Sequence, residues 1–202
     1  VRCILNSGFA RRIFRQLSRA CADAVICESQ ATQRAMYPRS KSHVFTIHAP
    51  GPGPEFLGPT APMPDLQQGL QLIAIAKFLE VKGHRNLIEV PQRLISSGVN
   101  VQVTIIGRCQ EGHETYYQEC MDLLARYQLE PHVTIVPFLP QAEVAQALDA
   151  SHVLVHLPNY QDPLPGVVLE AMARARPVVA FDSGGISEEF VHRESGMLIR
   201  QG

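Results

Sequence analysis

The stretch Leu70-Gln-Leu-Ile-Ala-Ile-Ala76 decides the fold, because it reads as a buried strand and a helical pattern over 84–96 follows it. The alternation continues with strands expected at 101–106, 133–136, 152–156, 177–181 and 197–199, and helices at 114–127, 141–148, 165–175 and 187–191. Such alternation is typical of a parallel sheet flanked by helices. The sequence therefore predicts an α/β, Rossmann-like domain with ligands beyond the carboxyl ends of its strands. Pro91 should kink or split the first helix, since proline removes a backbone hydrogen bond.

A shorter pattern of the same kind precedes this domain. We expect a basic amphipathic helix at 7–22, strands at 24–27 and 43–47, and a short helix at 29–36. Prolines and glycines then interrupt the chain over 50–64. We therefore divide the chain into residues 1–50, a linker at 51–66 and a main domain at 67–202. Val1 enters in the middle of an element and Gly202 directly follows a strand, so a fragment truncated at its C-terminus is expected.

Composition narrows the classes of function. Of the 202 residues, 46% are hydrophobic and 18% charged, as in ordinary globular proteins. A net charge of −1 gives no argument for binding nucleic acid. No apolar run approaches the ~18 residues needed to cross a bilayer, and the N-terminus has no targeting pattern. Five scattered cysteines favour a reducing, cytoplasmic compartment and no bound metal.

Two lysines follow the first strand of the main domain. Lys77 and Lys82, the latter before Gly83, can both reach a ligand at the carboxyl end of that strand. A diphosphate would suit them, because charge-assisted contacts are strong and a leaving diphosphate gains negative charge. From spacing alone, two solvated loop lysines are the more common outcome. The next strand ends at Gly107, which either lets a ligand approach the backbone or only serves a turn.

The segment DPLPGVVLE, from Asp162 to Glu170, joins a strand to an almost wholly apolar helix. The free N–H groups near Gly166 and Val167 would form an anion site at the start of that helix. Glu170 lies about one turn inside, where a carboxylate among apolar residues usually faces a cleft or a partner. Two structural explanations stay open: an ion pair of Glu170 with Arg174, and a helix-capping role for Asp162.

A fourth motif, Asp182-Ser-Gly-Gly-Ile-Ser-Glu188, follows the strand at 177–181. Its glycine pair permits a tight turn or a nest of backbone donors, and Glu188 opens the next helix. A simple turn with a favourable charge at the helix start explains the motif nearly as well.

Taken in order, these elements resemble family 4 of the retaining glycosyltransferases, which have the two-domain GT-B architecture. The resemblance covers nearly the whole chain from Ala22 to Ile199. It rests on Lys77 with Lys82-Gly83, Ile106-Gly107, Asp162 with Glu170-Ala-Met-Ala173, Pro177-Val-Val179, Gly184-Gly185-Ile-Ser-Glu188 and, upstream, Ala22–Ser29. It implies that residues 1–50 end an acceptor-side N-terminal domain and that residues 67–202 bind a nucleotide sugar.

The resemblance further implies transfer of a hexosyl group with retention of configuration, without a cofactor and without a metal. The implied catalytic residues are Lys82, Asp162 and Glu170, and the implied donor-binding residues are Lys77, Lys82, Gly83, Gly107, Phe138, Leu139, Gly166, Val167 and Glu170. The lysines would hold the diphosphate, Glu170 the ribose and Asp162 the transferred sugar, while the loop after Val136 would face the nucleobase. The acceptor, a glycan, a lipid or a small molecule, is left open.

Three departures from the family pattern put the donor preference in doubt. Lys77 stands where arginine is usual, and Asp162 stands where glutamate is usual. Pro163-Leu-Pro-Gly166 replaces Gly-Phe-Gly-Leu and removes two backbone N–H donors. A non-catalytic Rossmann-like module and another GT-B enzyme, such as a nucleotide-sugar epimerase, remain alternatives.

We expect the chain alone to be inactive. Its arginine-rich helix at 7–22 either contacts anionic lipid at a membrane surface or is an ordinary solvated helix.

Overall fold

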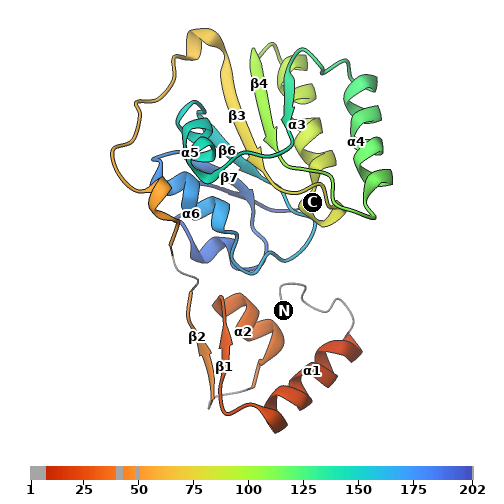
Figure 1. Ribbon diagram of the computed structural model, residues 1–202, viewed down its shortest axis with the longest axis vertical. Coiled ribbons are helices and arrows are strands. Elements are labelled where there is room, and N and C mark those ends of the chain that lie inside the picture. Colours follow the sequence, from red (N-terminus) through yellow and green to blue (C-terminus); the bar gives the residue numbers. More distant parts are fainter. Residues whose placement is uncertain (1–7, 40–42, 49–50, 202) are drawn as a thin grey trace.

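A six-stranded parallel sheet dominates the computed structural model, which describes residues 8–39, 43–48 and 51–201 (Figure 1). Its strands are β3 (Leu70–Ile75), β4 (Val101–Ile106), β5 (Val133–Val136), β6 (Val153–His156), β7 (Val178–Phe181) and β8 (Gly196–Ile199). They lie in the order β5-β4-β3-β6-β7-β8. The chain therefore reverses its direction of travel between β3 and β6, and open α/β sheets bind ligands at such a switch point. The predicted α/β, Rossmann-like fold is confirmed.

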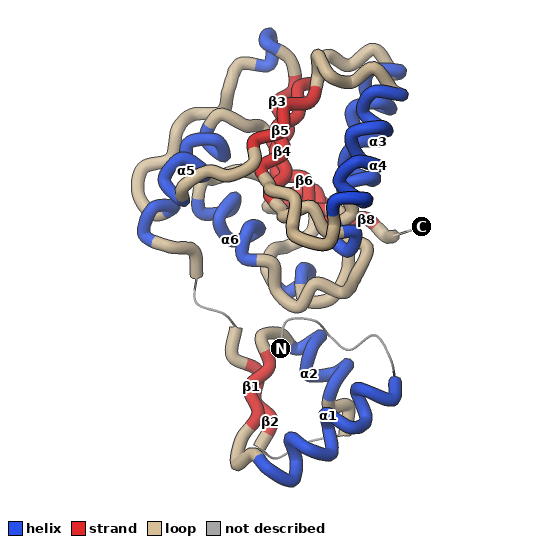
Figure 2. Tube along the Cα trace, turned by 45° about the vertical axis from the view of Figure 1, so that its right-hand side comes forward, coloured by secondary structure: helices blue, strands red, loops and turns tan. Residues whose placement is uncertain are grey.

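Helices cover both faces of this sheet because side chains alternate along each strand. Leu72 and Ala74 of β3 point into a first core beneath α3 (His84–Ser96) and α4 (Glu114–Arg126). Ile73, between them, points into a second core beneath α5 (Gln141–Asp149) and α6 (Gly166–Ala173). Figure 2 shows the two helix pairs on opposite sides of the strands. Apolar side chains of the described residues fill both faces, so a ligand is expected at the strand ends.

Predicted strands and long helices begin and end within two residues of their positions in the structure, but two local predictions are wrong. Of the kink or split expected at Pro91, the split is wrong: helix α3 runs without interruption over its full length, and Pro91 is buried in it. The short helix expected at 187–191 is a single 3-10 turn, η4 (Ile186–Glu188).

The N-terminal segment, residues 8–48, is a small α/β unit. It contains α1 (Gly8–Cys21), β1 (Val25–Cys27), α2 (Gln30–Met36) and β2 (Val44–Thr46), with β1 and β2 paired in parallel. A few side chains form its core, namely Cys27, Met36, Tyr37 and Val44 with Phe14 and Val25 against them. Phe9 and Leu17 of α1 are largely exposed. Among the described residues, no helix is long and apolar enough to cross a membrane.

The proline- and glycine-rich stretch between the two units is fastened to the main domain. Its 3-10 turn η1 (Pro54–Phe56) inserts Phe56 into the second core, where only 1% of the residue is exposed. Arg174 donates to the carbonyl oxygen of Pro59 at 2.9 Å, and Arg176 donates to that of Ala61 at 2.6 Å. Arginine side chains thus replace the backbone partners that a proline-rich stretch lacks.

Candidate functional site

A buried carboxylate lies at the carboxyl ends of the central strands. Asp162, in the loop after β6, is only 4% exposed. Its Oδ2 atom accepts hydrogen bonds from Lys82 Nζ at 2.9 Å and from the hydroxyl of Tyr160 at 2.7 Å. Nε2 of His156, the last residue of β6, lies 3.5 Å from the same oxygen. We call Lys82, His156, Tyr160 and Asp162 the edge cluster.

The electrostatics of the edge cluster favour an ionised Asp162. Burial alone would raise the pKa of this carboxyl group, but contacts with His156, Lys82 and Tyr160 outweigh burial and lower the pKa to about 2. Lys82 also donates to the Tyr160 hydroxyl at 2.7 Å and lies over its ring at 4.8 Å from the centroid. A pair of opposite charges is therefore already assembled at the switch point between β3 and β6.

Close backbone approaches position the loop that carries Lys82. Gly83 follows the 3-10 turn η3 (Glu80–Lys82) with a φ of 72°. A Cβ atom on Gly83 would lie 1.9 Å from the carbonyl oxygen of Leu157, so only glycine lets this loop rest on the loop after β6. Gly107 also permits a close backbone approach, since a Cβ atom on it would lie 1.8 Å from the carbonyl oxygen of Ala76.

A glycine pair positions the loop that carries Asp162. A Cβ atom on Gly184 would lie 2.0 Å from the Asp162 carbonyl oxygen, and one on Gly185 would lie 1.9 Å from that of Pro163. The Gly185 N–H donates to the Asp162 carbonyl oxygen at 2.8 Å. The Ser183 hydroxyl donates to the Tyr160 carbonyl oxygen at 2.7 Å. The glycine motif after β7 therefore fixes the backbone of the edge cluster.

Helix α6 begins beside this loop and leaves two groups without partners. Its first N–H groups, at Gly166 and Val167, have no partner within the helix. Glu170 is half-buried, burial raises its pKa, and no hydrogen bond or ion pair joins its carboxylate to a described residue. Arg174 pairs with Asp149 instead, so the Glu170–Arg174 ion pair is wrong. The capping role for Asp162 is also wrong, because the N-cap of α6 is Pro165.

The remaining predicted site residues lie on loops at the same edge. Lys77 follows β3 and is exposed, and none of the described residues forms an ion pair with it. Phe138 and Leu139 follow β5: Phe138 is 69% exposed, whereas Leu139 packs against the second core. The structure thus joins Lys82 to Asp162 but leaves Lys77 in solvent.

Comparison with known proteins assigns the family. A family model described as glycosyl transferases group 1 matches residues 66–202. The chain belongs to this family. It is 31% identical over 143 residues to the amylovoran biosynthesis glycosyltransferase AmsK of Erwinia amylovora, covering 68% of this chain and 34% of AmsK. It is also 31% identical over 136 residues to WcaL of Escherichia coli K12, a putative colanic acid biosynthesis glycosyltransferase, covering 64% of this chain and 32% of WcaL.

Solved structures of GT-B glycosyltransferases share the fold. The crystal structure of Anabaena HepE in complex with UDP and glucose superposes with a TM-score of 0.84 at 23% identity, over 99% of this chain and 56% of HepE. The chain therefore spans about a third of the length of the curated relatives it matches and about half of this structural neighbour.

Glu188 of this glycosyltransferase-family chain joins the main domain to the N-terminal segment. Its carboxylate accepts hydrogen bonds from the backbone N–H groups of Gln30 at 2.8 Å and Ala31 at 2.6 Å, and His48 Nε2 lies 3.1 Å away. Burial opposes ionisation of Glu188, but these N–H groups and His48 outweigh it and lower its pKa. The expectation that Glu188 opens a helix of its own is wrong: it ends η4, and its carboxylate accepts hydrogen bonds from the first two N–H groups of α2.

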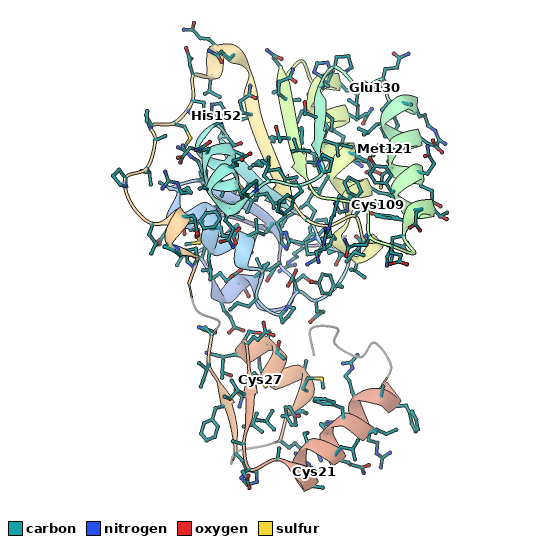
Figure 3. The ribbon with its side chains drawn as sticks, in the orientation of Figure 1. Cys21, Cys27, Cys109, Met121, Glu130 and His152 are labelled. Carbon is teal, nitrogen blue, oxygen red and sulfur yellow. The ribbon has the colours of Figure 1, made fainter. Side chains whose placement is uncertain are left out.

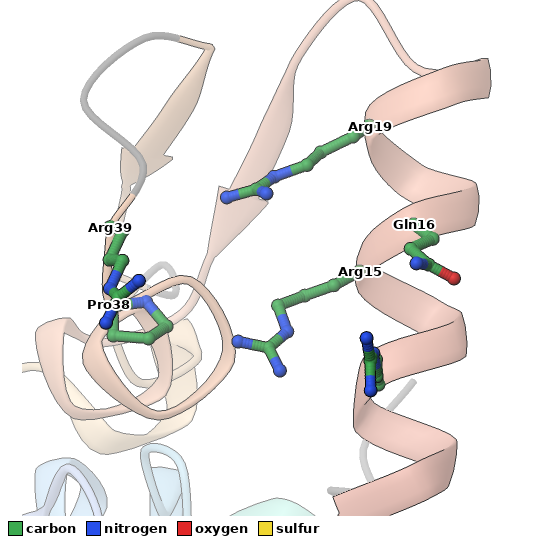
Figure 4. A pocket seen from close by; sticks show the side chains of 6 residues that line it. Arg15, Gln16, Arg19, Pro38 and Arg39 are labelled. Atoms are coloured by element: carbon green, nitrogen blue, oxygen red, sulfur yellow. The ribbon is translucent and has the colours of Figure 1, made fainter.

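Arginines line a groove in the N-terminal segment, between α1 and the turn after α2 (Figure 4). We call this the arginine groove, and its lining residues are Arg12, Arg15, Gln16, Arg19, Pro38 and Arg39. Arg15 and Arg19 extend from α1 toward the turn at Pro38 (Figure 4). None of its four arginines forms an ion pair with another described residue. Within the part of the chain that the structure describes, the groove is therefore a concentration of positive charge without ion pairs.

Metal and disulfide chemistry find no support among the residues that the structure describes. No group of three or more His, Cys, Asp or Glu side chains there could hold a metal ion. Cys21, Cys27, Cys109 and Cys120 are free. Figure 3 shows Cys21 and Cys27 in the N-terminal segment and Cys109 in the main domain. Cys3 lies outside the described residues.

Sequence reasoning missed three residues around Asp162. His156 ends a strand, Tyr160 lies two residues before Asp162, and Glu189 follows η4. Both carboxylate oxygens of Glu189 are buried without a partner among the described residues. Burial and the charge of Asp162 raise the Glu189 pKa to about 8. Of the three, only His156 had a signal in the sequence, as a polar residue at the carboxyl end of an apolar strand, and hydrophobic periodicity alone does not distinguish such a residue from a core residue.

Proposed function

We propose that this chain is the donor-binding part of a retaining glycosyltransferase that transfers a hexosyl group from a nucleoside-diphosphate sugar. The observation that carries the proposal is the Lys82–Asp162 pair at the switch point of the sheet, beside the unpaired first N–H groups of α6. A cation and a helix N-terminus together suit a diphosphate. A buried carboxylate between them suits the hydroxyl groups of a sugar.

Each residue then has a task in the transfer. Lys82 and the N–H groups of Gly166 and Val167 stabilise the negative charge that develops on the leaving diphosphate, which a metal ion does in other enzymes. Lys77 adds a solvent-exposed charge to the same site. Asp162 orients the transferred sugar by accepting its hydroxyl hydrogen bonds.

Helix α6 and the loop after β5 recognise the nucleoside. Glu170 accepts hydrogen bonds from the ribose hydroxyls, which its half-buried and unpaired carboxylate supports. The exposed ring of Phe138 lies against the base, with Leu139 anchoring the loop. HepE was crystallised with UDP and with UDP-glucose, so UDP is the first nucleotide to test.

The test is calorimetric titration of the 202-residue chain with UDP, GDP and ADP. We expect one of them to bind, Lys82→Ala to weaken binding by about 100-fold, and Glu170→Ala by about tenfold. Glu130→Ala, at an exposed position before β5 and at the opposite end of the sheet, is the matched control and should bind like the wild type. A folded wild-type chain that binds none of the three nucleotides would sink the proposal and favour a non-catalytic module.

The division of labour between domains is part of the proposal. Residues 67–202 form the donor domain, residues 51–66 the link, and residues 1–50 the end of an acceptor-side domain. The chain alone transfers no sugar, because an acceptor must be held opposite the donor in a cleft that excludes water. AmsK is named for the biosynthesis of amylovoran and WcaL, putatively, for that of colanic acid, and of the acceptor classes left open we would test glycans first. Glycosylation of an acceptor by these 202 residues would contradict this division.

A membrane contact in the cytoplasm completes the proposal. The free cysteines support a reducing compartment. The arginine groove supports attraction to anionic headgroups, since positive charge near a membrane surface contributes about 1 kcal/mol per residue. Sedimentation with vesicles tests this contact. Vesicles containing phosphatidylglycerol should retain the chain, purely zwitterionic vesicles should not, and equal retention by both would refute the contact.

A further inference from the structure

His156 is a buried imidazole whose Nε2 atom has no well-formed hydrogen bond to any described residue. It is 5% exposed, and no described residue hydrogen-bonds to its Nε2 atom. Buried polar groups in folded proteins nearly always have a partner, so this one needs an explanation. His156 Nε2 lies 3.5 Å from Asp162 Oδ2, which is too far for a well-formed hydrogen bond. The imidazole therefore lies beside a carboxylate that Lys82 and Tyr160 hold by hydrogen bonds, and its own contact with that carboxylate is longer.

Without a bound nucleotide sugar, the charges that face His156 balance. Asp162 is ionised and Lys82 neutralises it. Tyr160, on the same loop as Asp162, contributes a hydroxyl group that donates to it. Glu189, on the segment after η4, keeps its proton at neutral pH because burial and Asp162 raise its pKa to about 8. One cation thus compensates one anion in a largely buried shell.

A nucleoside-diphosphate sugar would upset this balance. Its two phosphate groups bring two negative charges next to Lys82, whose ammonium must then serve the diphosphate and Asp162 together. The ammonium of Lys82 is already paired with Asp162, and Glu189 already holds its proton. Of the residues facing Asp162, His156 alone can then add a positive charge, because a neutral imidazole has a second nitrogen that can accept a proton.

We infer that His156 takes up a proton from solvent when a nucleoside-diphosphate sugar binds, and that its charged Nε2–H group then holds Asp162 in place for the transferred sugar. This inference rests on the proposed function. His156 is a positioning residue in this scheme, since it acts on the sugar through Asp162. Donor affinity should fall as pH rises, by up to about tenfold per pH unit across the range of proton uptake.

Calorimetry in two buffers measures the proton directly. The chain is titrated at about pH 7 with the first of UDP-glucose, GDP-mannose and ADP-glucose that binds, once in PIPES and once in Tris. These buffers differ in ionisation enthalpy, so the difference in observed heat gives the number of protons taken up. These sugars carry no phosphate group that titrates near neutral pH, which leaves the protein as the source of the signal.

Two matched variants identify the group that takes the proton. His156→Gln keeps a hydrogen-bond donor but cannot ionise, so proton uptake should vanish and donor affinity should fall about tenfold. Glu189→Gln removes the carboxyl group near Asp162 whose pKa is raised and whose oxygens have no partner among the described residues. This variant should leave the proton uptake unchanged. If His156→Gln does not fold, His156→Asn takes its place. The numbers of protons taken up by the wild type and by Glu189→Gln still show whether uptake occurs and whether Glu189 is its source.

The outcomes separate the inference from the proposed function. If no donor binds to the folded wild type, both fail. If a donor binds without proton uptake, or if the uptake survives in the His156 variant, the inference alone is overturned. Loss of the uptake in Glu189→Gln with its retention in His156→Gln would assign the proton to Glu189 and also overturn the inference.

Discussion

The edge cluster and the arginine groove both carry positive charge, but among the described residues ion pairs form in the edge cluster and not in the groove. In the edge cluster, Lys82 is held by a carboxylate and a hydroxyl at 2.9 Å and 2.7 Å. In the arginine groove, four arginines line one pocket without an ion pair to any described residue. Solvent exposure separates the two places: Asp162 is buried, whereas Arg12, Arg19 and Arg39 are exposed.

This difference shows how burial decides which charges are part of the fold. A buried carboxylate loses its water and is stable only with a partner, so Asp162 and Lys82 need each other. Exposed arginines keep their water and are screened by salt, so they need no partner and remain available for attraction over a longer range. Changes at the edge cluster should therefore cost stability, and changes in the arginine groove should cost little.

The largest expected effect comes from Gly83, which lets the two loops of the edge cluster meet. Gly83→Ala places a Cβ atom 1.9 Å from the Leu157 carbonyl oxygen and forces alanine to a φ of 72°. We expect a loss of about 3–5 kcal/mol in the free energy of unfolding, measured by urea denaturation. Gly98→Ala is the control: its φ of 80° is also left-handed, but no atom lies within 4 Å of its Cβ. It should lose only about 1 kcal/mol, and equal losses would refute the role of the close approach.

A smaller loss is expected when the buried charge pair is broken. Asp162→Asn leaves Lys82 without its anion and should lose about 2 kcal/mol at pH 7. The folded pKa of about 2 lies below the ordinary value of 3.8, so the stabilisation is complete above about pH 4 and declines as pH falls toward 2. Between pH 5 and 3, the free energy of unfolding should therefore change less steeply with pH in Asp162→Asn than in the wild type. An unchanged slope would mean that Asp162 is not the group held ionised.

Glu189 should behave in the opposite sense. Its folded pKa of about 8 lies above the ordinary 4.5, so the folded state keeps the proton and loses stability as pH rises from about 4.5 to 8. Glu189→Gln removes that penalty and should gain about 2 kcal/mol at pH 8, with little change at pH 5. Glu194→Gln, at an exposed position nearby, should change stability at neither pH. Equal behaviour of the two variants would contradict a buried, protonated Glu189.

Periodicity predicted most of the fold and the loops of the site, but not which charges meet. Parallel strands end at one edge, so Lys82 and Asp162 could be placed there from their positions after two strands. Their pairing spans 80 residues and depends on the glycines that bring two loops into contact, which spacing along the chain does not reveal. His156 was missed because it ends an apolar strand, where periodicity cannot distinguish a site residue from a core residue.

The smallest expected effect lies in the arginine groove. Arg15 stands four residues after Arg11 and four before Arg19, and like charges at this spacing destabilise a helix by about 0.2–0.5 kcal/mol per pair. Arg15→Gln should therefore raise the thermal midpoint slightly at low salt, and the gain should vanish in high salt because salt screens the repulsion. Arg126→Gln, in the last turn of α4, removes the same charge without such neighbours and should give no gain. A loss of stability in Arg15→Gln at low salt would show that the groove's charge is compensated after all, and the contrast with the edge cluster would fail.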